Sequence, residues 1–226
     1  MFDYHYNANL RKLIVGFGSL FSNILIKHTD PTTQNDVTIR VPIHYSPQEK
    51  FIQRLLEPSS ITDGTRIETQ VPVISFIMNS VSPDPSRRLG RLAMNTNQQT
   101  GASCGANGNQ IKTQLPVNVN FNLFVYTRHT EDMLQIVEQI MPYFLPEHII
   151  TLDMNAVQND VQIPIVMVGN NLSERYEGDF SSRRLNIATF QFMAKSWLFG
   201  QVAPVTGIQQ TAGTYGFTGS INFDID

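Results

Sequence analysis

The clearest pattern along the chain is an alternation of apolar and polar side chains over the segment 117–125. The odd-numbered positions hold Val, Phe or Leu, whereas positions 118, 120 and 122 all hold Asn. Successive side chains of a β-strand point to opposite faces of a sheet. The alternation therefore predicts a strand with one buried apolar face and one polar face.

The segment 130–144 follows with apolar residues at steps of three and four, which predicts an amphipathic helix. We expect Thr130 to be the N-cap, with Glu131 and Asp132 favourably placed at the positive end of the helix dipole. Pro146 prevents the helix from continuing. The predicted apolar stripe consists of Met133, Ile136, Val137, Ile140, Met141 and Phe144.

A second amphipathic helix is predicted from Leu10 to about Ser22, where apolar residues again recur at helical spacing. Gly16 and Gly18 each weaken a helix by about 1 kcal/mol relative to Ala, unless they allow a neighbour to pack closely. The start of this segment resembles a signal peptide, but polar residues precede it and no small-x-small cleavage site follows. No apolar run reaches the length of a transmembrane helix.

The remaining elements are predicted to be mostly strands. A hairpin is expected from Ile24–Ile26 and Val37–Tyr45, and a short helix begins at Ser46. Pro42 and Pro72 lack an N–H group and therefore indicate an edge strand or a bulge. Further strands are predicted at Arg66–Met78, Val161–Val168 and Leu185–Trp197, with a late strand-like piece at Ser220–Ile225.

This order of elements predicts an α+β fold: a mainly antiparallel sheet covered by helices on one face. We expect a single domain over 1–197, with a long loop excursion at about 79–110. The segment 198–226 is predicted to be an extended C-terminal tail that docks on a neighbouring subunit.

Composition adds a hint about partners. Charged residues make up 15% of the chain, against about a quarter in typical domains. A surface with few charges suits a subunit that is buried among partners. The net charge of -3 and the lack of a basic stripe argue against nucleic-acid binding. The single cysteine, Cys104, excludes an intrachain disulfide and metal sites made only of cysteines.

The most enzyme-like string is Gly101–Gly105, which matches the G-x-S-x-G nucleophile elbow with Ser103 as the nucleophile. That motif needs a strand before it and a helix after it, and neither is predicted here. A flexible loop is the favoured interpretation, and a serine hydrolase remains a remote alternative. The five histidines show no metal-ligand spacing, and no phosphate-binding glycine motif occurs. We therefore expect no catalytic residues, no cofactor and no metal.

Several longer strings go beyond composition. They are Phe2-x-Tyr4-x-Tyr6-Asn7, Leu20-Phe21-Ser22-Asn23-Ile24-x-Ile26-Lys27, Ile39-Arg40-Val41-Pro42-Ile43-x-Tyr45, Thr127-Arg128, Asp132-Met133-x-Gln135-Ile136-Val137-Glu138-Gln139-Ile140-x-Pro142-Tyr143-Phe144-x-Pro146, Ser182-Arg183-Arg184 and Trp197. In this order and spacing they resemble the tail sheath stabilizer and completion proteins of T-even-like contractile-tailed bacteriophages. The resemblance runs from the N-terminus to about Trp197. The segment 79–110 departs from the family pattern, and no long acidic, proline-rich extension follows Trp197.

The resemblance implies a structural virion protein that forms a hexameric ring on top of the tail. Such a ring caps the tube, stabilises the contractile sheath and gives the neck and head a docking surface. The implied partners are other copies of the chain, the tail sheath protein, the tube or tube terminator protein and a neck protein. DNA passes through the ring without specific binding, no membrane is involved, and assembly takes place in the host cytoplasm.

Six residues are candidates for contacts between subunits or with these partners. Three lie on the polar face of the predicted helix at 130–144, and three are arginines in the family-like strings: Arg40, Gln135, Glu138, Gln139, Arg183 and Arg184. One alternative is a neck adaptor or tube terminator that does not grip the sheath. Another is a small RNA-binding module, although the basic, aromatic sheet face that it needs is not visible.

Overall fold

The structure is a computed structural model, and it describes residues 4–29, 36–50, 52, 71–88, 90, 94–97, 108–112, 114–154, 160–176 and 184–205. Its centre is a six-stranded sheet with the order β3-β4-β7-β10-β9-β8. β3 runs parallel to β4, and every other neighbouring pair is antiparallel. The strands are β3 (Ile43–Tyr45), β4 (Val73–Pro83), β7 (Leu115–Thr127), β8 (His148–Leu152), β9 (Val161–Tyr176) and β10 (Arg184–Leu198).

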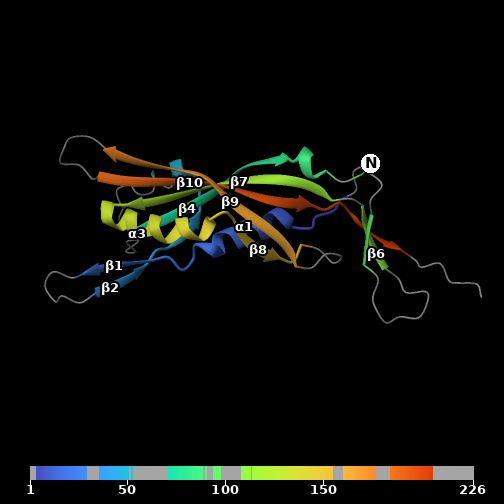
Figure 1. Cartoon of the computed structure of the whole chain (residues 1–226), viewed down its shortest axis with the longest axis horizontal. Coiled ribbons are helices and arrows are strands. Elements are labelled where there is room, and N and C mark those ends of the chain that lie inside the picture. The colour runs from blue at the N-terminus through green and yellow to red at the C-terminus, as the bar shows by residue number, and fades with distance from the viewer. Residues whose placement is uncertain are drawn as a thin grey trace, which may run out of the picture.

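Two helices, α1 (Asn9–Leu20) and α3 (Thr130–Ile140), lie on one side of the sheet (Figure 1). The core between the layers is aromatic. Phe17 of α1 stacks on Phe121 of β7 with 4.3 Å between ring centroids, and Phe21 and Phe192 pack around this pair. The predicted α+β fold with helices on one face of the sheet is confirmed.

The glycines of α1 explain how the helix approaches the sheet. A Cβ atom on Gly18 would lie 2.8 Å from Cζ of Phe76, and one on Gly16 would lie 3.0 Å from a methyl group of Leu152. Real Cβ atoms avoid such distances, so any side chain at Gly18 would force the core to shift. The two glycines therefore allow close packing of the helix on β4 and β8.

The hairpin consists of β1 (Leu25–Thr29) and β2 (Asp36–Arg40), which form a separate two-stranded sheet beside α3 (Figure 1). The predicted second arm, 37–45, is divided at Pro42. The Val41 amide donates to Ile24 and closes the hairpin, whereas the Pro42 carbonyl accepts from Ile74 and begins the pairing of β3 with β4. Because Pro42 has no N–H group, the chain changes sheets at this point.

The segment 79–110, which shows no periodic pattern, contains more regular structure than the sequence indicates. β4 continues to Pro83, and a short 3-10 helix (Pro85–Arg87) follows. β5 (Met94–Asn97), β6 (Gly108–Lys112) and β11 (Val202–Val205) form a three-stranded antiparallel sheet that projects from the end of the body (Figure 1). β11 belongs to the predicted tail and pairs with β6 of its own chain. Docking of this tail on a neighbour stays a prediction.

Helix boundaries differ from the prediction in three places. The N-cap of α3 is His129 and not Thr130, and it makes no side-chain cap hydrogen bond. The Thr130 hydroxyl instead accepts a hydrogen bond from the Asn186 side chain. α1 ends at Leu20, and the end of α3 passes into a 3-10 turn (Met141–Phe144). Residues 48–50 are helical as predicted after Ser46, while 66–70 and 220–225 lie outside the described residues.

Candidate interaction surfaces

The enzyme-like features give no site in the described part of the chain. The string Gly101–Gly105, with Ser103, lies outside the described residues. Among those that are described, no group of three or more His, Cys, Asp or Glu side chains could hold a metal ion. None of the helices seen in the same residues is long and apolar enough to cross a membrane. The surfaces below are therefore considered as binding surfaces.

The two candidate glutamines of α3 act together on the edge of β1. Gln135 accepts from the Lys27 amide at 3.0 Å and donates to the Lys27 carbonyl at 3.1 Å. Gln139 accepts from the Leu25 amide at 3.3 Å and donates to the Leu25 carbonyl at 2.6 Å. The two side chains thus satisfy outward backbone groups of β1 as a neighbouring strand would. His28 adds a contact of 3.3 Å to the carboxylate of Asp132.

Among the described side chains, the other candidate contact residues do not bond to the edge of β1. Glu138 is exposed, on the side of α3 that faces away from the core. Arg40 donates to the Ser22 carbonyl at 2.8 Å and to the Asn23 side chain at 3.1 Å, which ties β2 to the end of α1. Arg184 begins β10, and Arg183 lies outside the described residues. The structure therefore brings Gln135 and Gln139 together on the hairpin, and it does not bring Arg184 to them.

A half-open cavity lies between the ends of the two helices. It has a volume of about 280 Å³ and is lined by Leu20, Phe21, Asn23, Ile24, Gln139, Ile140, Tyr143, Phe144 and His148. Tyr143 is 69% exposed and Leu145, just beyond the 3-10 turn, is 79% exposed. We call this cavity with Tyr143 and Leu145 the turn groove. Exposed aromatic and aliphatic side chains beside an apolar hollow are typical of a contact surface.

Every phenylalanine that the structure describes is buried. The exposed aromatic residues in this described part of the chain are tyrosines: Tyr4, Tyr6, Tyr45 and Tyr143. Tyr4 and Tyr6 belong to an extended N-terminal segment, which Asn7 fixes by donating to the carbonyls of Phe199 and Gly200, both at 3.1 Å.

The face of the sheet that the helices leave open is polar and nearly uncharged. Asn118, Asn120 and Asn122 of β7 lie opposite Lys195, Met193 and Gln191 of β10. Asn120 donates to the Ser80 hydroxyl of β4 at 3.0 Å. One end of this face is closed by a small cluster in which Ile52 packs against Val73, Phe124, Tyr126 and Ile187. Lys195 is the one charge among the residues just named on β7 and β10.

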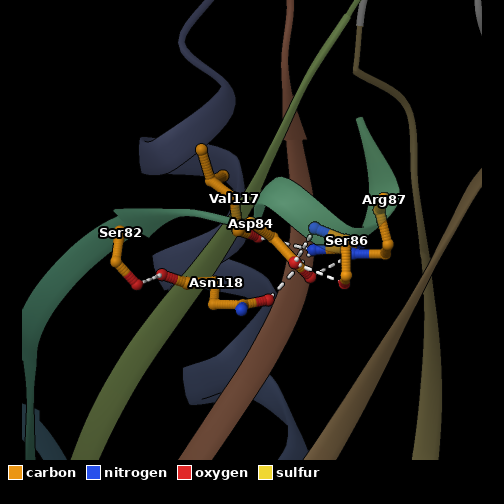
Figure 2. A network of polar contacts seen from close by, with 6 residues as sticks. All are labelled: Ser82, Asp84, Ser86, Arg87, Val117 and Asn118. Carbon is orange, nitrogen blue, oxygen red and sulfur yellow. Dashed lines mark hydrogen bonds and ion pairs between the residues drawn. The ribbon is translucent and has the colours of Figure 1, made fainter. Parts of the chain in front are cut away.

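An ion pair closes the opposite end of the same face, at the root of the projecting sheet. Arg87 donates to Asp84 at 2.7 Å, to the Val117 carbonyl at 3.1 Å and to the Asn118 side chain at 3.0 Å (Figure 2). Its guanidinium group also lies 5.1 Å from the ring centroid of Trp197. Hydrogen bonds from the Ser86 side chain and from Arg87 hold the pKa of the Asp84 carboxyl well below its usual range. These contacts link the end of β4 to β7 and β10.

The partners of Arg87 in this ion pair and the position of the turn groove were not predicted from the sequence. The only local signal for the ion pair is the sequence Asp84-Pro85-Ser86-Arg87. A short polar side chain before a proline is typical of a turn start. The partners in β7 and β10 are distant in the sequence, so spacing alone could not reveal them.

Comparison with known proteins adds independent information. Residues 4–222 match the profile of the family described as T4-like virus Myoviridae tail sheath stabiliser. The chain is also 33% identical, over 221 residues, to a protein of Enterobacteria phage T4 named tail completion protein gp15. That alignment covers 95% of this chain and 79% of the phage T4 protein.

Proposed function

The chain belongs to the T4-like virus Myoviridae tail sheath stabiliser family, and on that basis we propose that it forms a hexameric ring at the top of a contractile tail. As a member of this family it is a structural protein of the virion tail that associates with sheath and tube components. The ring holds the last layer of sheath subunits and presents a docking surface to the neck. DNA passes through its centre, and the ring assembles on the tail in the host cytoplasm.

The turn groove is the observation that best supports a sheath contact. Tyr143 lines the cavity and is 69% exposed, and Leu145, two residues further along the chain, is 79% exposed, although burying side chains of this size is favourable by about 1.5–3 kcal/mol each. Tyr143 lies within the string around Gln135–Phe144, which is the most specific part of the family resemblance. We propose that the turn groove receives an apolar side chain of the sheath protein. Of the six candidate contact residues, Gln139 lines this cavity, and the other five remain candidates for contacts between copies or with partners.

The test compares two tyrosines of nearly equal exposure. Tyr143→Ala should weaken co-sedimentation of the purified protein with sheathed tails about ten-fold or more, because a central aromatic anchor is lost. Tyr6→Ala, which removes a tyrosine that is 66% exposed in the extended N-terminal segment, should leave it unchanged. Equal binding by both variants would refute the turn groove as the sheath contact.

Ring symmetry is tested separately by negative-stain microscopy with mass measurement. Six-fold rings with an open centre, alone or on tails, are the expected result. Twelve-fold rings, or rings that bind tubes but not sheath, would instead favour a neck adaptor or a tube terminator.

A further inference from the structure

The two edges of the β1–β2 hairpin differ in whether their outward backbone groups have hydrogen-bond partners. In an antiparallel pair, residues alternate between positions whose backbone groups point to the partner strand and positions whose groups point outward. The hydrogen bond from the Val41 amide to Ile24 and the register Leu25↔Arg40 place Leu25 and Lys27 in outward positions on β1. The outward groups of both are taken by Gln139 and Gln135. This edge is therefore closed.

The same alternation places Thr38 and Arg40 in outward positions on β2. Within the described residues, the backbone amide and carbonyl of Thr38 have no partner on that side. Val37 and Ile39, which flank Thr38, are 50% and 40% exposed. An edge strand with β-branched residues and open backbone groups is a template for another strand.

Among the described residues, a second open edge lies at the opposite end of the molecule. The projecting sheet has the order β11-β6-β5, so β11 and β5 are its two edges (Figure 1). β11 contains Pro204, which has no N–H group and makes a poor edge for pairing. β5, Met94–Asn97, contains no proline. β5 is therefore the edge of this sheet on which no outward position lacks an N–H group.

We propose that β5 of one copy of the chain pairs with β2 of the next copy and so joins neighbouring subunits head to tail. This proposal rests on the ring of the proposed function, because a closed ring requires two different patches on each subunit. The two edges lie at opposite ends of the molecule and have similar lengths, four residues in β5 and five in β2. The added strand would also cover Val37 and Ile39.

A proline at position 38 tests the open edge without breaking the hairpin. Thr38→Pro removes an outward N–H group but none of the hydrogen bonds between β1 and β2, whereas Thr38→Ala keeps the amide. We expect Thr38→Pro to weaken self-association about ten-fold or more in sedimentation experiments, while Thr38→Ala behaves as the wild type. Circular dichroism checks that both variants fold. Equal association of the two variants would overturn the proposal.

Cross-linking identifies the partner strand. The full chain, with Cys104 replaced by serine, receives Thr38→Cys together with either Thr96→Cys in β5 or Ala203→Cys in β11, and a short bis-maleimide joins neighbouring thiols. The pair with Thr96→Cys should give a ladder of linked subunits, and the pair with Ala203→Cys should give far less.

The proposal that β5 pairs with β2 is overturned if the variant with Thr96→Cys is cross-linked no more strongly than the variant with Ala203→Cys. If the wild type still forms rings, the proposed function stands and only the strand contact is wrong. If no assembly forms alone or on sheathed tails, the ring itself is refuted, and the strand contact with it.

Discussion

Strands β7 and β10 each contribute to two very different faces. On one face, Phe121 and Phe192 meet the aromatic side of α1 and are completely or almost completely buried. On the other face, Asn120 and Asn122 lie half-buried with few charges around them. Both sets come from the same alternating sequence, so the difference arises from what covers each face. One face stabilises the subunit through its buried core, and the other stays partly exposed.

Phe121→Ala should have the largest effect on stability. The ring is fully buried and stacks on Phe17, so its removal costs the transfer free energy and leaves a cavity, about 3–5 kcal/mol in total. Asn122→Ala, the next residue on the same strand but on the open face, should change stability by about 0.5 kcal/mol or less. Urea unfolding of both variants measures the difference. Similar losses would mean that the two faces do not differ in their contribution.

Gly18→Ala should have a smaller destabilising effect. The added methyl group would lie 2.8 Å from the buried ring of Phe76, and such overpacking costs about 1–3 kcal/mol. The higher helix propensity of alanine offsets about 1 kcal/mol of this loss in stability. Gly16→Ala is the matched control, because its methyl group meets the flexible end of Leu152 and can be accommodated. Thermal unfolding should therefore rank Gly18→Ala clearly below Gly16→Ala.

The covered face was largely predictable from the sequence. The alternation at 117–125 and the helical spacing at 133–144 report directly on burial, because each element has a fixed period. β8 was not predicted, since five residues with a single buried side chain, Ile150, show too little pattern between two other elements. The end of β9 was also missed, because its polar residues run on to Tyr176 at the sheet margin.

The contact residues were less predictable, for a physical reason. Gln135 and Gln139 stand on a polar helix face, which the sequence cannot distinguish from a solvated face. The structure shows that their amides pair with β1, more than 100 residues earlier in the chain (108 and 114 positions away). Arg87 likewise depends on the register that brings Asn118 beside it. Such contacts depend on the sheet pairing and not on local spacing.

Asp84→Asn should have the smallest effect of the three, and it tests the margin of the open face. Because the pKa of Asp84 is lowered in the folded chain, its contribution to stability is present above the usual carboxyl pKa of 3.8 and is lost as the pH falls through the lowered value. The Tm of the variant should thus lie slightly below that of the wild type at neutral pH, and the two should converge in acid. Asp84 is only partly buried, so solvent screening keeps the effect small. Asp160→Asn is the control, since asparagine tolerates the positive φ of 58° at this exposed position, and it should show no such convergence.

A Tm difference for Asp84→Asn that persists unchanged into acid would show that the ion pair with Arg87 does not stabilise this end of the sheet. The projecting sheet would then be held in place by its strand pairing alone.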